Sequence, residues 1–581
     1  MKHLGITLLL LAISIAAGFT HLGERDFWPP DEARYGEVSR ELREGDHSPL
    51  VPHLNGRLYP DKPPGYFLAI HASAELLGEM GEGAARFPSF VGATLLVLLV
   101  GLWVARATTA GAGLLAGILL LASVLFSWQM RYAQMDMLVA SATGLMMAAF
   151  FRTWNGGSVW WCTAGWVALT VGVLVKGPIA PIGLLAVVIW VFATRRPGAL
   201  FNRGSLVGVL LFAAVTGAGA WYVSGLDQGD EYLRKLVGFH VIERAKSGHA
   251  HVKPWWAYAR ILPTSLLPFS PLLLLGLSRR VRESLMQSSR PLLRFALLWC
   301  FVFVVVQSSV PGKRSIYALP VFPAVAIILA LLIDGAARAR PRVLCGFALL
   351  VSSILVMIGL TCVVGGFHAD HLNQGIQFAD DLSGGKVWPQ LARHGVTFDR
   401  ESDLVAGLFL VGCVVAPLAL AGTTIALRGS PRSALGLVGL TFVAAVGAGC
   451  GFVAPHLDHV QSRRAVADVI RQLEAERGRP GAVFMFHHLD EGVPFYLART
   501  VPEIPDRFSE ELGGERLHKS DESDRRLART TLVNALLDFD VLVIAREEDL
   551  RKFGVIDDFV DHVTARVRVG KRTFLVLAAL P

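Results

Sequence analysis

The sequence predicts a mainly α-helical membrane protein with many transmembrane helices, followed by a small α/β domain. Its 581 residues are 53% hydrophobic and 18% charged, with a mean hydropathy of +0.49. Soluble globular domains carry roughly a quarter charged residues, so this composition indicates a polytopic membrane protein. Apolar segments recur until about residue 453, and the chain then becomes polar and mixed.

Thirteen segments are candidates for membrane spans, each close to the ~20 mostly apolar residues that a spanning helix needs. They are 4–20, 84–105, 111–128, 135–152, 159–175, 178–194, 205–224, 256–277, 292–309, 316–333, 343–364, 404–427 and 433–453. The first segment has the basic start and apolar core of a signal peptide, but it lacks a clear small-x-small cleavage site. We therefore expect it to remain as the first helix.

Clusters of arginine between the apolar segments predict the orientation of the chain. They are RRPGALFNR (195–203), SRRVRESLMQSSRPLLR (278–294), DGAARARPR (334–342) and RGSPR (428–432). If Met1 starts in the cytoplasm, strict alternation of the thirteen segments leaves all four clusters in the cytoplasm. The positive-inside rule requires this arrangement, so the clusters support the count of spans.

The same alternation leaves the remaining polar stretches on the far side, in the periplasm. They are 21–83, the turns at 131–136 and 176–177, 225–255, 311–314, 365–403 and the chain after about 454. We predict a transmembrane domain, 1–454, with periplasmic loops 21–83 and 225–255, and a periplasmic α/β domain, 455–581. Charged residues of the first loop then converge with Asp136, Lys176, His240 and Lys313. Lys313 and Arg314 form a basic pair against the orientation trend, which indicates either an anion site or a snorkelling pair.

The first periplasmic loop contains its own predicted elements. Pro30 precedes Asp31 and Glu32, and this order is typical of a helix start, while Gly45 ends the helix. Its apolar and small positions predict an amphipathic helix along the membrane surface. Asn55-Gly56 predicts a turn, and residues 66–77 form a short apolar segment at the interface. The alternative is an ordinary solvated loop that contains one amphipathic helix.

Several classes of site are not supported. The net charge of +8 arises from the orientation clusters rather than from a basic patch, so nucleic acid is not a predicted partner. The six cysteines include no CxxC pair, so neither a disulfide framework nor a cysteine metal site is indicated. Residues 455–581 contain a helix, AVADVIRQLEAER, and three strands, GAVFMFHH, DVLVIA and FLVLAAL. His487, His488 and Asp490 form a polar cluster there, which fits a strand-end loop as well as a site.

Five motifs occur in order within roughly the first 335 residues: DEARYGEVSREL, VPHLNGRLYPDKPPGYF, RYAQMDML, LVKGPIA and GKRSIYALPVFPA. As an ordered set they resemble a family of bacterial membrane glycosyltransferases, the aminoarabinose transferases that modify lipid A, which are related to protein O-mannosyltransferases. The resemblance implies a GT-C fold of about thirteen transmembrane helices in the inner membrane, with a periplasmic active site and C-terminal domain. It also implies a donor sugar carried on undecaprenyl phosphate. The predicted α/β domain, 455–581, contains no GxxxxGK[ST] or GxGxxG loop, which fits a compartment without nucleotide sugars.

The chemistry of such a donor indicates which residues act. Cations must hold the lipid phosphate as the glycosidic bond breaks, and a carboxylate near the anomeric carbon can accept a proton or stabilise positive charge. Asp31 is the first candidate for the carboxylate, because the positive end of a helix favours its ionised form, and Asp136 is the second. The candidates for the donor phosphate are Arg34, Lys62, Arg244, Lys176 and Lys313. The alternative for Asp136 is a helix N-cap, and for Lys176 an interfacial anchor.

The family can also hold a divalent, zinc-like metal ion between the acidic residue before this lysine and a histidine of the later loop. Here the acidic residue is Asp61, where the family usually has Glu, and the histidine is His240. His249 and His251 are alternatives to His240. Zinc prefers three or four protein ligands, so two ligands make a weak site.

The predicted function is therefore transfer of a sugar, aminoarabinose if the resemblance holds in detail, from undecaprenyl phosphate to a periplasmic acceptor. The acceptor is lipid A or another glycolipid, a polysaccharide, or protein Ser/Thr in a reaction like that of the O-mannosyltransferases. A transporter or flippase for lipid-linked sugars is less well supported, because the polar residues cluster at one face and no half-repeat is visible. A protein that only binds glycolipid is the third alternative.

Overall fold

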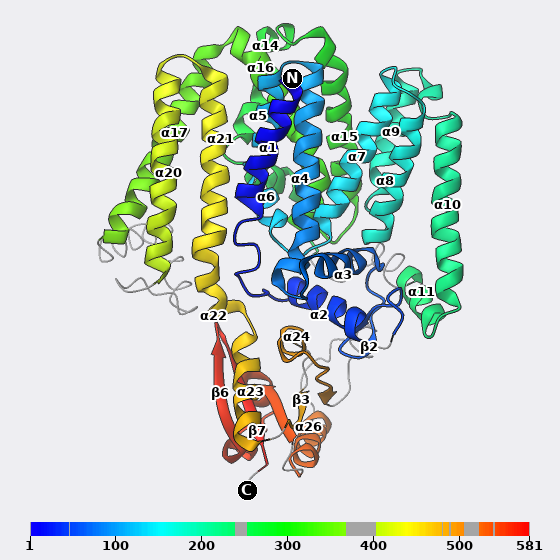
Figure 1. Cartoon of the computed structure of the whole chain (residues 1–581), viewed down its shortest axis with the longest axis vertical. Coiled ribbons are helices and arrows are strands. Elements are labelled where there is room, and N and C mark those ends of the chain that lie inside the picture. Colours follow the sequence, from blue (N-terminus) through cyan, green and yellow to red (C-terminus); the bar gives the residue numbers. More distant parts are fainter. Residues whose placement is uncertain are drawn as a thin grey trace.

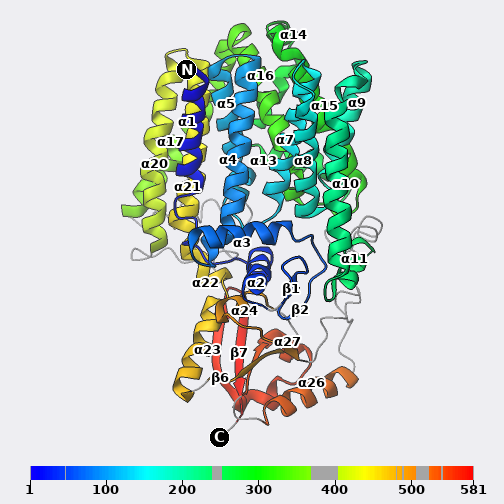
Figure 2. The same cartoon turned by 45° about the vertical axis from the view of Figure 1, so that its right-hand side comes forward.

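A bundle of long helices forms one end of the molecule, and a small sheet domain forms the other (Figure 1). The computed structural model describes residues 2–45, 47–238, 252–367, 403–478, 480–486, 490–504, 522–537 and 541–579. Residues 239–251 of the predicted loop 225–255 and nearly all of the predicted loop 365–403 lie outside these residues. A layer of short elements, which includes α2 and α3, separates the bundle from the sheet domain in both views (Figures 1 and 2).

The bundle consists of single helices and two bent pairs. The single helices are α1 (Lys2–Gly18), α4 (Glu82–Ala107), α7 (Asp136–Trp154), α8 (Trp160–Lys176), α9 (Pro181–Ala193), α10 (Arg203–Ser224), α15 (Arg290–Ser309), α16 (Phe322–Ala339), α17 (Pro341–Phe367), α20 (Asp403–Leu427) and α21 (Pro431–Ala448). The pairs are α5 (Ala110–Leu121) with α6 (Val124–Met130), bent by 75°, and α13 (Ala257–Ser265) with the 3-10 helix Ser270–Leu277, bent by 108°. Each of the thirteen predicted segments overlaps one of these helices or pairs.

Length and apolar composition qualify eight helices among the described residues as membrane spans, or up to ten if each bent pair is one span. Three further apolar helices, His3–Gly18, Trp160–Lys176 and Pro181–Ala193, are shorter. The chain is therefore a multi-span membrane protein, and the exact number of thirteen spans stays a prediction.

The centre of the bundle is α16. In the most apolar 18-residue window of the segment Ser315–Ala339, which contains α16, 94% of the residues are buried, whereas the corresponding share for α10 at the edge is 11%. A helix that is apolar on all sides can be buried in this way because it has no polar face to solvate. Asp334 is the buried exception, and it pairs with Arg338 at 2.7 Å and with Arg432 at 2.9 Å. Two of the predicted basic clusters therefore meet at the end of α16.

The first loop folds into α2 (Asp31–Glu44), the hairpin β1 (His53–Leu54) and β2 (Arg57–Leu58), and α3 (Gly65–Leu77). The predicted helix start at Asp31 and the stop at Gly45 are confirmed. Asn55-Gly56 is the predicted turn, with φ angles of 55° and 75°, which suit Asn and Gly in a two-residue hairpin.

The prediction that α2 is an amphipathic surface helix is wrong. Ten of its fourteen residues are buried, including Glu32, Glu37, Arg40 and Glu41. The helix lies between α3 and α24 (Gly492–Leu497), so its outer face is covered by the C-terminal part of the chain. Its charges are paired instead of solvated: Arg40 donates to both carboxylate oxygens of Glu37 at 2.8 and 2.9 Å.

The C-terminal part contains a five-stranded sheet in the order β4 (Glu503–Ile504), β3 (Ala482–Phe486), β5 (Val541–Arg546), β7 (Arg572–Ala578) and β6 (Val563–Val569). The first three strands are parallel, and β7 and β6 are antiparallel additions. Helices α23 (Arg464–Arg477), α26 (Glu522–Ala535) and α27 (Glu547–Lys552) accompany the sheet. The predicted helix and the three predicted strands are confirmed. Strand β6 was not among the predicted strands, although its residues VTARVRV alternate between apolar and polar side chains as in a half-buried strand.

Polar and aromatic contacts join the sheet domain to the first loop. Asn55 donates to the carbonyl of Val501 and accepts from its N–H, both at 2.7 Å. The indole of Trp28 donates to Asp458 at 2.7 Å, and the rings of Phe27 and Phe495 lie 4.7 Å apart. These contacts fix the first loop against the end of the chain.

Candidate active site

Asp31 is the centre of the candidate site. It is the first residue of α2 and is buried. Its carboxylate accepts hydrogen bonds from the Gln134 amide at 2.6 Å and from the Arg314 guanidinium at 3.0 Å. Three segments that are distant in the sequence thus meet at one carboxylate.

Arg314 contacts Asp31 directly, whereas its position in the sequence identifies it only as half of a basic pair. Burial disfavours its charge, but Asp31 beside it holds the pKa of Arg314 above its usual value, so the guanidinium stays cationic. Gln134 was not singled out either, although it lies within the RYAQMDML motif. The only feature of the sequence that could have indicated a role for these two residues is their place in the ordered motifs, because neither residue belongs to a periodic pattern.

Asp136 and Lys176 form a buried ion pair beside this centre. Asp136 is the first residue of α7, and Met135 occupies the N-cap position. Lys176 ends α8, and its ammonium also lies 4.8 Å from the ring centroid of Tyr317. The alternative for Asp136 was an N-cap and that for Lys176 an interfacial anchor; in the structure the two side chains form an ion pair with each other. Whether Lys176 binds the donor phosphate and whether Asp136 acts in catalysis stay predictions.

Arg34 points to a partner from the other end of the chain. Its guanidinium donates to the Glu491 carboxylate at 2.8 Å. Burial raises the pKa of Glu491, and Arg34 opposes this increase. Burial likewise disfavours the charge of Arg34, but Glu491 holds the pKa of Arg34 well above its usual value. No sequence pattern linked these two residues, because 457 positions separate them.

Neutralising Glu491 is expected to destabilise the protein. Glu491→Gln leaves the buried charge of Arg34 without its partner, so we expect the free energy of unfolding to fall by about 2 kcal/mol. The double variant Arg34→Gln/Glu491→Gln removes both charges and should lose less than the sum of the two single variants. Thermal unfolding in detergent measures these differences. Arg551→Gln, which breaks the exposed pair with Glu547, is the control and should match the wild type. Additive losses in the double variant would contradict the coupling.

Asp61 and Lys62 follow the buried Tyr59 in the segment between β2 and α3. The ammonium of Lys62 donates to the Asp61 carbonyl at 3.0 Å. The Lys62 carbonyl accepts from the Tyr232 hydroxyl at 2.8 Å, and Tyr232 lies on α11 (Gly229–Val237). Tyr59 is fully buried, and burial followed by the charge of Asp61 raises the pKa of its hydroxyl well above the usual value, so this hydroxyl stays protonated. The described part of the predicted loop 225–255 therefore contacts the backbone carbonyl of Lys62, the predicted phosphate ligand.

Lys313 is buried and donates to the carbonyls of Val310 at 2.5 Å, Lys253 at 3.1 Å and Pro311 at 3.5 Å. This geometry ties two loops together, and Arg314 is the member of the basic pair that contacts Asp31. A role for Lys313 in binding phosphate stays a prediction.

The predicted metal site is only partly within the described residues. Asp61 is described, whereas His240, its alternatives His249 and His251, and the predicted phosphate ligand Arg244 lie outside. No group of three or more His, Cys, Asp or Glu side chains that could hold a metal ion occurs in the described part of the chain. One carboxylate does not fit a zinc ion without further ligands. The metal ion stays a prediction, and no chemical step below depends on it.

Glu32, next to Asp31, holds the loop in position. It is fully buried and accepts from Arg25 at 2.6 Å, from Arg86 at 2.8 Å and from the N–H groups of Trp28 and Ala133 at 3.1 and 3.0 Å. Burial alone would raise the pKa of Glu32, but the two arginines hold it below its usual value. Glu32 therefore joins the loop, α4 and the turn that contains Gln134.

Comparisons with known proteins bear on the predicted resemblance. The family model described as dolichyl-phosphate-mannose-protein mannosyltransferase matches residues 61–221. The chain is 30% identical over 340 residues to the undecaprenyl phosphate-alpha-4-amino-4-deoxy-L-arabinose arabinosyl transferase of Edwardsiella ictaluri, covering 57% of this chain and 60% of that protein. It is 28% identical over 367 residues to the protein of the same name from Pseudomonas savastanoi pv. phaseolicola, covering 61% and 66%. The chain thus aligns with less than two thirds of either relative.

A solved structure extends the likeness over the whole chain. The crystal structure of ArnT from Cupriavidus metallidurans bound to undecaprenyl phosphate matches with a TM-score of 0.74 at 19% identity, covering 99% of both chains. The resemblance predicted from the motifs is confirmed, and the chain has the GT-C fold of this protein.

Proposed function

We propose that this chain is a membrane glycosyltransferase that moves aminoarabinose from undecaprenyl phosphate to lipid A. The observation that carries the proposal is the buried Asp31 carboxylate, which pairs with Arg314 and accepts from Gln134 at one end of a helical bundle. The Asp136–Lys176 ion pair begins two residues after Gln134, and Arg34 lies on the same helix as Asp31. An anionic, lipid-linked donor needs cations for its phosphate and a carboxylate near its sugar. The relatives named above are arabinosyl transferases of undecaprenyl phosphate-linked aminoarabinose.

In the proposed reaction the cationic residues bind the donor phosphate, and the carboxylate of Asp31 acts on the sugar. Lys62 and Arg34, with Arg244, hold the donor phosphate and stabilise the negative charge that it gains as the bond to the sugar breaks. Asp31 lies near the anomeric carbon, where its carboxylate stabilises the positive charge of an oxocarbenium-like centre. A phosphate acceptor is already ionised and needs no general base, whereas a hydroxyl acceptor would give its proton to Asp31. Gln134 and Arg314 hold this carboxylate in one orientation.

The proposed enzyme crosses the inner membrane thirteen times, with its N-terminus in the cytoplasm and the Asp31 site in the periplasm. The structure supports this orientation through the distribution of arginine. The N-terminus and the helix junctions α9–α10, α16–α17 and α20–α21, which contain basic clusters, lie at the top of the bundle, and α2 lies at the bottom (Figure 1). The positive-inside rule assigns the top to the cytoplasm. In this proposal residues 1–454 form the transmembrane domain and 455–581 a periplasmic domain.

Reconstituted transfer tests the proposal. Purified protein is incubated with undecaprenyl phosphate-linked aminoarabinose and lipid A, without any nucleotide sugar. The mass of the lipid A is then measured by mass spectrometry. We expect lipid A to gain the mass of aminoarabinose, and a lipid A without phosphate groups to stay unmodified. Parallel reactions contain a polyprenyl phosphate-linked mannose with a Ser/Thr peptide, or a UDP-sugar with lipid A. Transfer only in one of these parallel reactions would replace the proposed donor or acceptor.

A further inference from the structure

A cavity of about 920 Å³ lies in the bundle away from the Asp31 site. Helices α4 and α8 both pack on α7, and residues of all three helices line the cavity together with the start of α15. Small side chains, which include Ala142, Ala149, Ala164 and Ala168, leave the space between the helices. None of the residues that contact Asp31 lines it, so the cavity is separate from the candidate active site.

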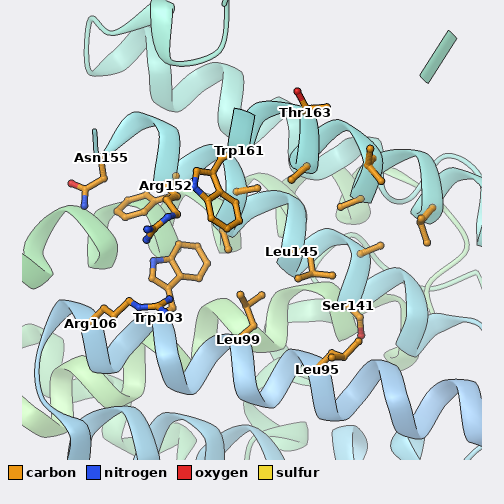
Figure 3. A pocket seen from close by; sticks show the side chains of 18 of the residues that line it. Leu95, Leu99, Trp103, Arg106, Ser141, Leu145, Arg152, Asn155, Trp161 and Thr163 are labelled. Atoms are coloured by element: carbon orange, nitrogen blue, oxygen red, sulfur yellow. The ribbon is translucent and has the colours of Figure 1, made fainter. Parts of the chain in front are cut away.

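The cavity is polar at one end and apolar along its length. Arg106, Arg152, Trp103 and Trp161 gather at one end, and Leu95, Leu99 and Leu145 follow along the rest (Figure 3). The lining of α7 runs from Leu138 to Arg152, which is about 21 Å at 1.5 Å per residue. The hydrocarbon of one leaflet is about 15 Å thick, so the groove is long enough for one extended acyl chain.

The polar end is strongly cationic. Arg106 and Arg152 are exposed, and the guanidinium of Arg152 lies 5.1 Å from the ring centroid of Trp161. Neither arginine makes an ion pair with the residues that the structure describes. Among the described residues, no aspartate or glutamate lines the cavity. Two guanidiniums at a membrane surface without acidic neighbours are complementary to a phosphate group.

From this geometry we propose that the groove binds one anionic phospholipid. Its phosphate contacts Arg106 and Arg152, its headgroup region lies beside the two indoles, and one acyl chain runs along Leu99 and Leu145. Basic pockets between transmembrane helices suit such headgroups, and tryptophan is enriched at this depth. The orientation proposed above makes this a lipid of the cytoplasmic leaflet, but the site itself does not depend on the proposed reaction.

The bound lipid fills the space between α4 and α8, and both helices hold parts of the active site at their opposite ends. Arg86 near the start of α4 contacts Glu32, and Lys176 at the end of α8 contacts Asp136. A ligand that binds only the folded protein stabilises it by mass action. The phospholipid is therefore a structural ligand of the bundle rather than a substrate.

Native mass spectrometry of the full-length protein in detergent tests this site, with phosphatidylglycerol as the probe and phosphatidylcholine of the same acyl chains as the neutral comparison. We expect the wild type to bind one phosphatidylglycerol about tenfold more tightly than phosphatidylcholine. Arg106→Gln/Arg152→Gln should remove this preference. Arg340→Gln/Arg342→Gln, which removes two exposed arginines of another basic cluster, should keep it. Leu145→Trp fills the groove and should weaken the binding of both lipids.

Three results would overturn the proposal. One is equal binding of the two lipids by the wild type, and another is unchanged preference in Arg106→Gln/Arg152→Gln. The third is displacement of phosphatidylglycerol by an equimolar amount of undecaprenyl phosphate, which would assign the groove to the polyprenyl lipid. Thermal unfolding of each variant without added lipid checks that it is folded. Transfer activity is not the readout, so failure of the proposed reaction would leave this test intact.

Discussion

Asp31→Asn is expected to slow sugar transfer by about three orders of magnitude and to leave the protein folded. Asparagine has nearly the same shape and still offers an oxygen to Gln134 or Arg314, so the two hydrogen bonds at 2.6 and 3.0 Å need only small adjustments. The negative charge next to the sugar is lost. Carboxylates that act on protons or on developing charge contribute about 10²–10⁴ in rate, and we expect kcat to fall by roughly 10³.

The measurement is the initial rate of transfer at saturating donor, together with the thermal unfolding of the same preparation. Asp230→Asn is the matched control, because Asp230 is exposed and forms an ordinary i,i+4 pair with Arg234 on α11. The control should keep the wild-type rate. If Asp31→Asn also turned over at that rate, Asp31 would have no part in the chemistry, and Asp136 would be the remaining candidate.

Glu32→Gln is expected to act on stability instead. The side chain is fully buried and neutralises Arg25 and Arg86 together, and glutamine leaves both cations buried with no counter-charge. Breaking a buried ion pair from one side costs about 3–5 kcal/mol. We expect the melting temperature of the purified protein to fall far below those of the wild type and Asp31→Asn.

The pH dependence of stability distinguishes the charge of Glu32 from its shape. Its folded pKa lies below the ordinary value of 4.5, so its stabilising contribution is present above that pH and is lost as the pH falls through the folded value. Glu32→Gln should therefore lose less stability than the wild type on acidification. Parallel melting curves of the two proteins between neutral and acidic pH would contradict an ionised Glu32.

Adjacent carboxylates thus receive different roles, and the sequence alone did not separate them. It predicted the start of α2 at Asp31, because Pro30 and two acids form a local signal that any helix start uses. Glu32 was read only as part of that signal. Its arginine partners are local or 54 residues away, and charged residues on a short polar stretch give no indication of burial.

The same limit explains the other differences. Apolar composition located every long helix, because the bilayer requires a continuous apolar segment. The Asn55-Gly56 turn and the strands DVLVIA and FLVLAAL were likewise predictable, since each depends on residues next to one another. The contacts of Asp31 with Gln134 and Arg314 span 103 and 283 positions. Such contacts depend on how distant segments pack, and in the sequence only the ordered set of motifs indicated that these segments belong to one site.

The pairing of Arg34 with Glu491 can form only after nearly the whole chain has been synthesised. The partner of Arg34 is made 457 residues later, which takes roughly 20 to 90 s at 5–20 residues per second. During that time the helices of the bundle can insert into the membrane, while Arg34 near the Asp31 site has no counter-charge from Glu491. A chain that ends before residue 491 can therefore insert its helices and still lack the carboxylate that pairs with Arg34 in the full-length protein.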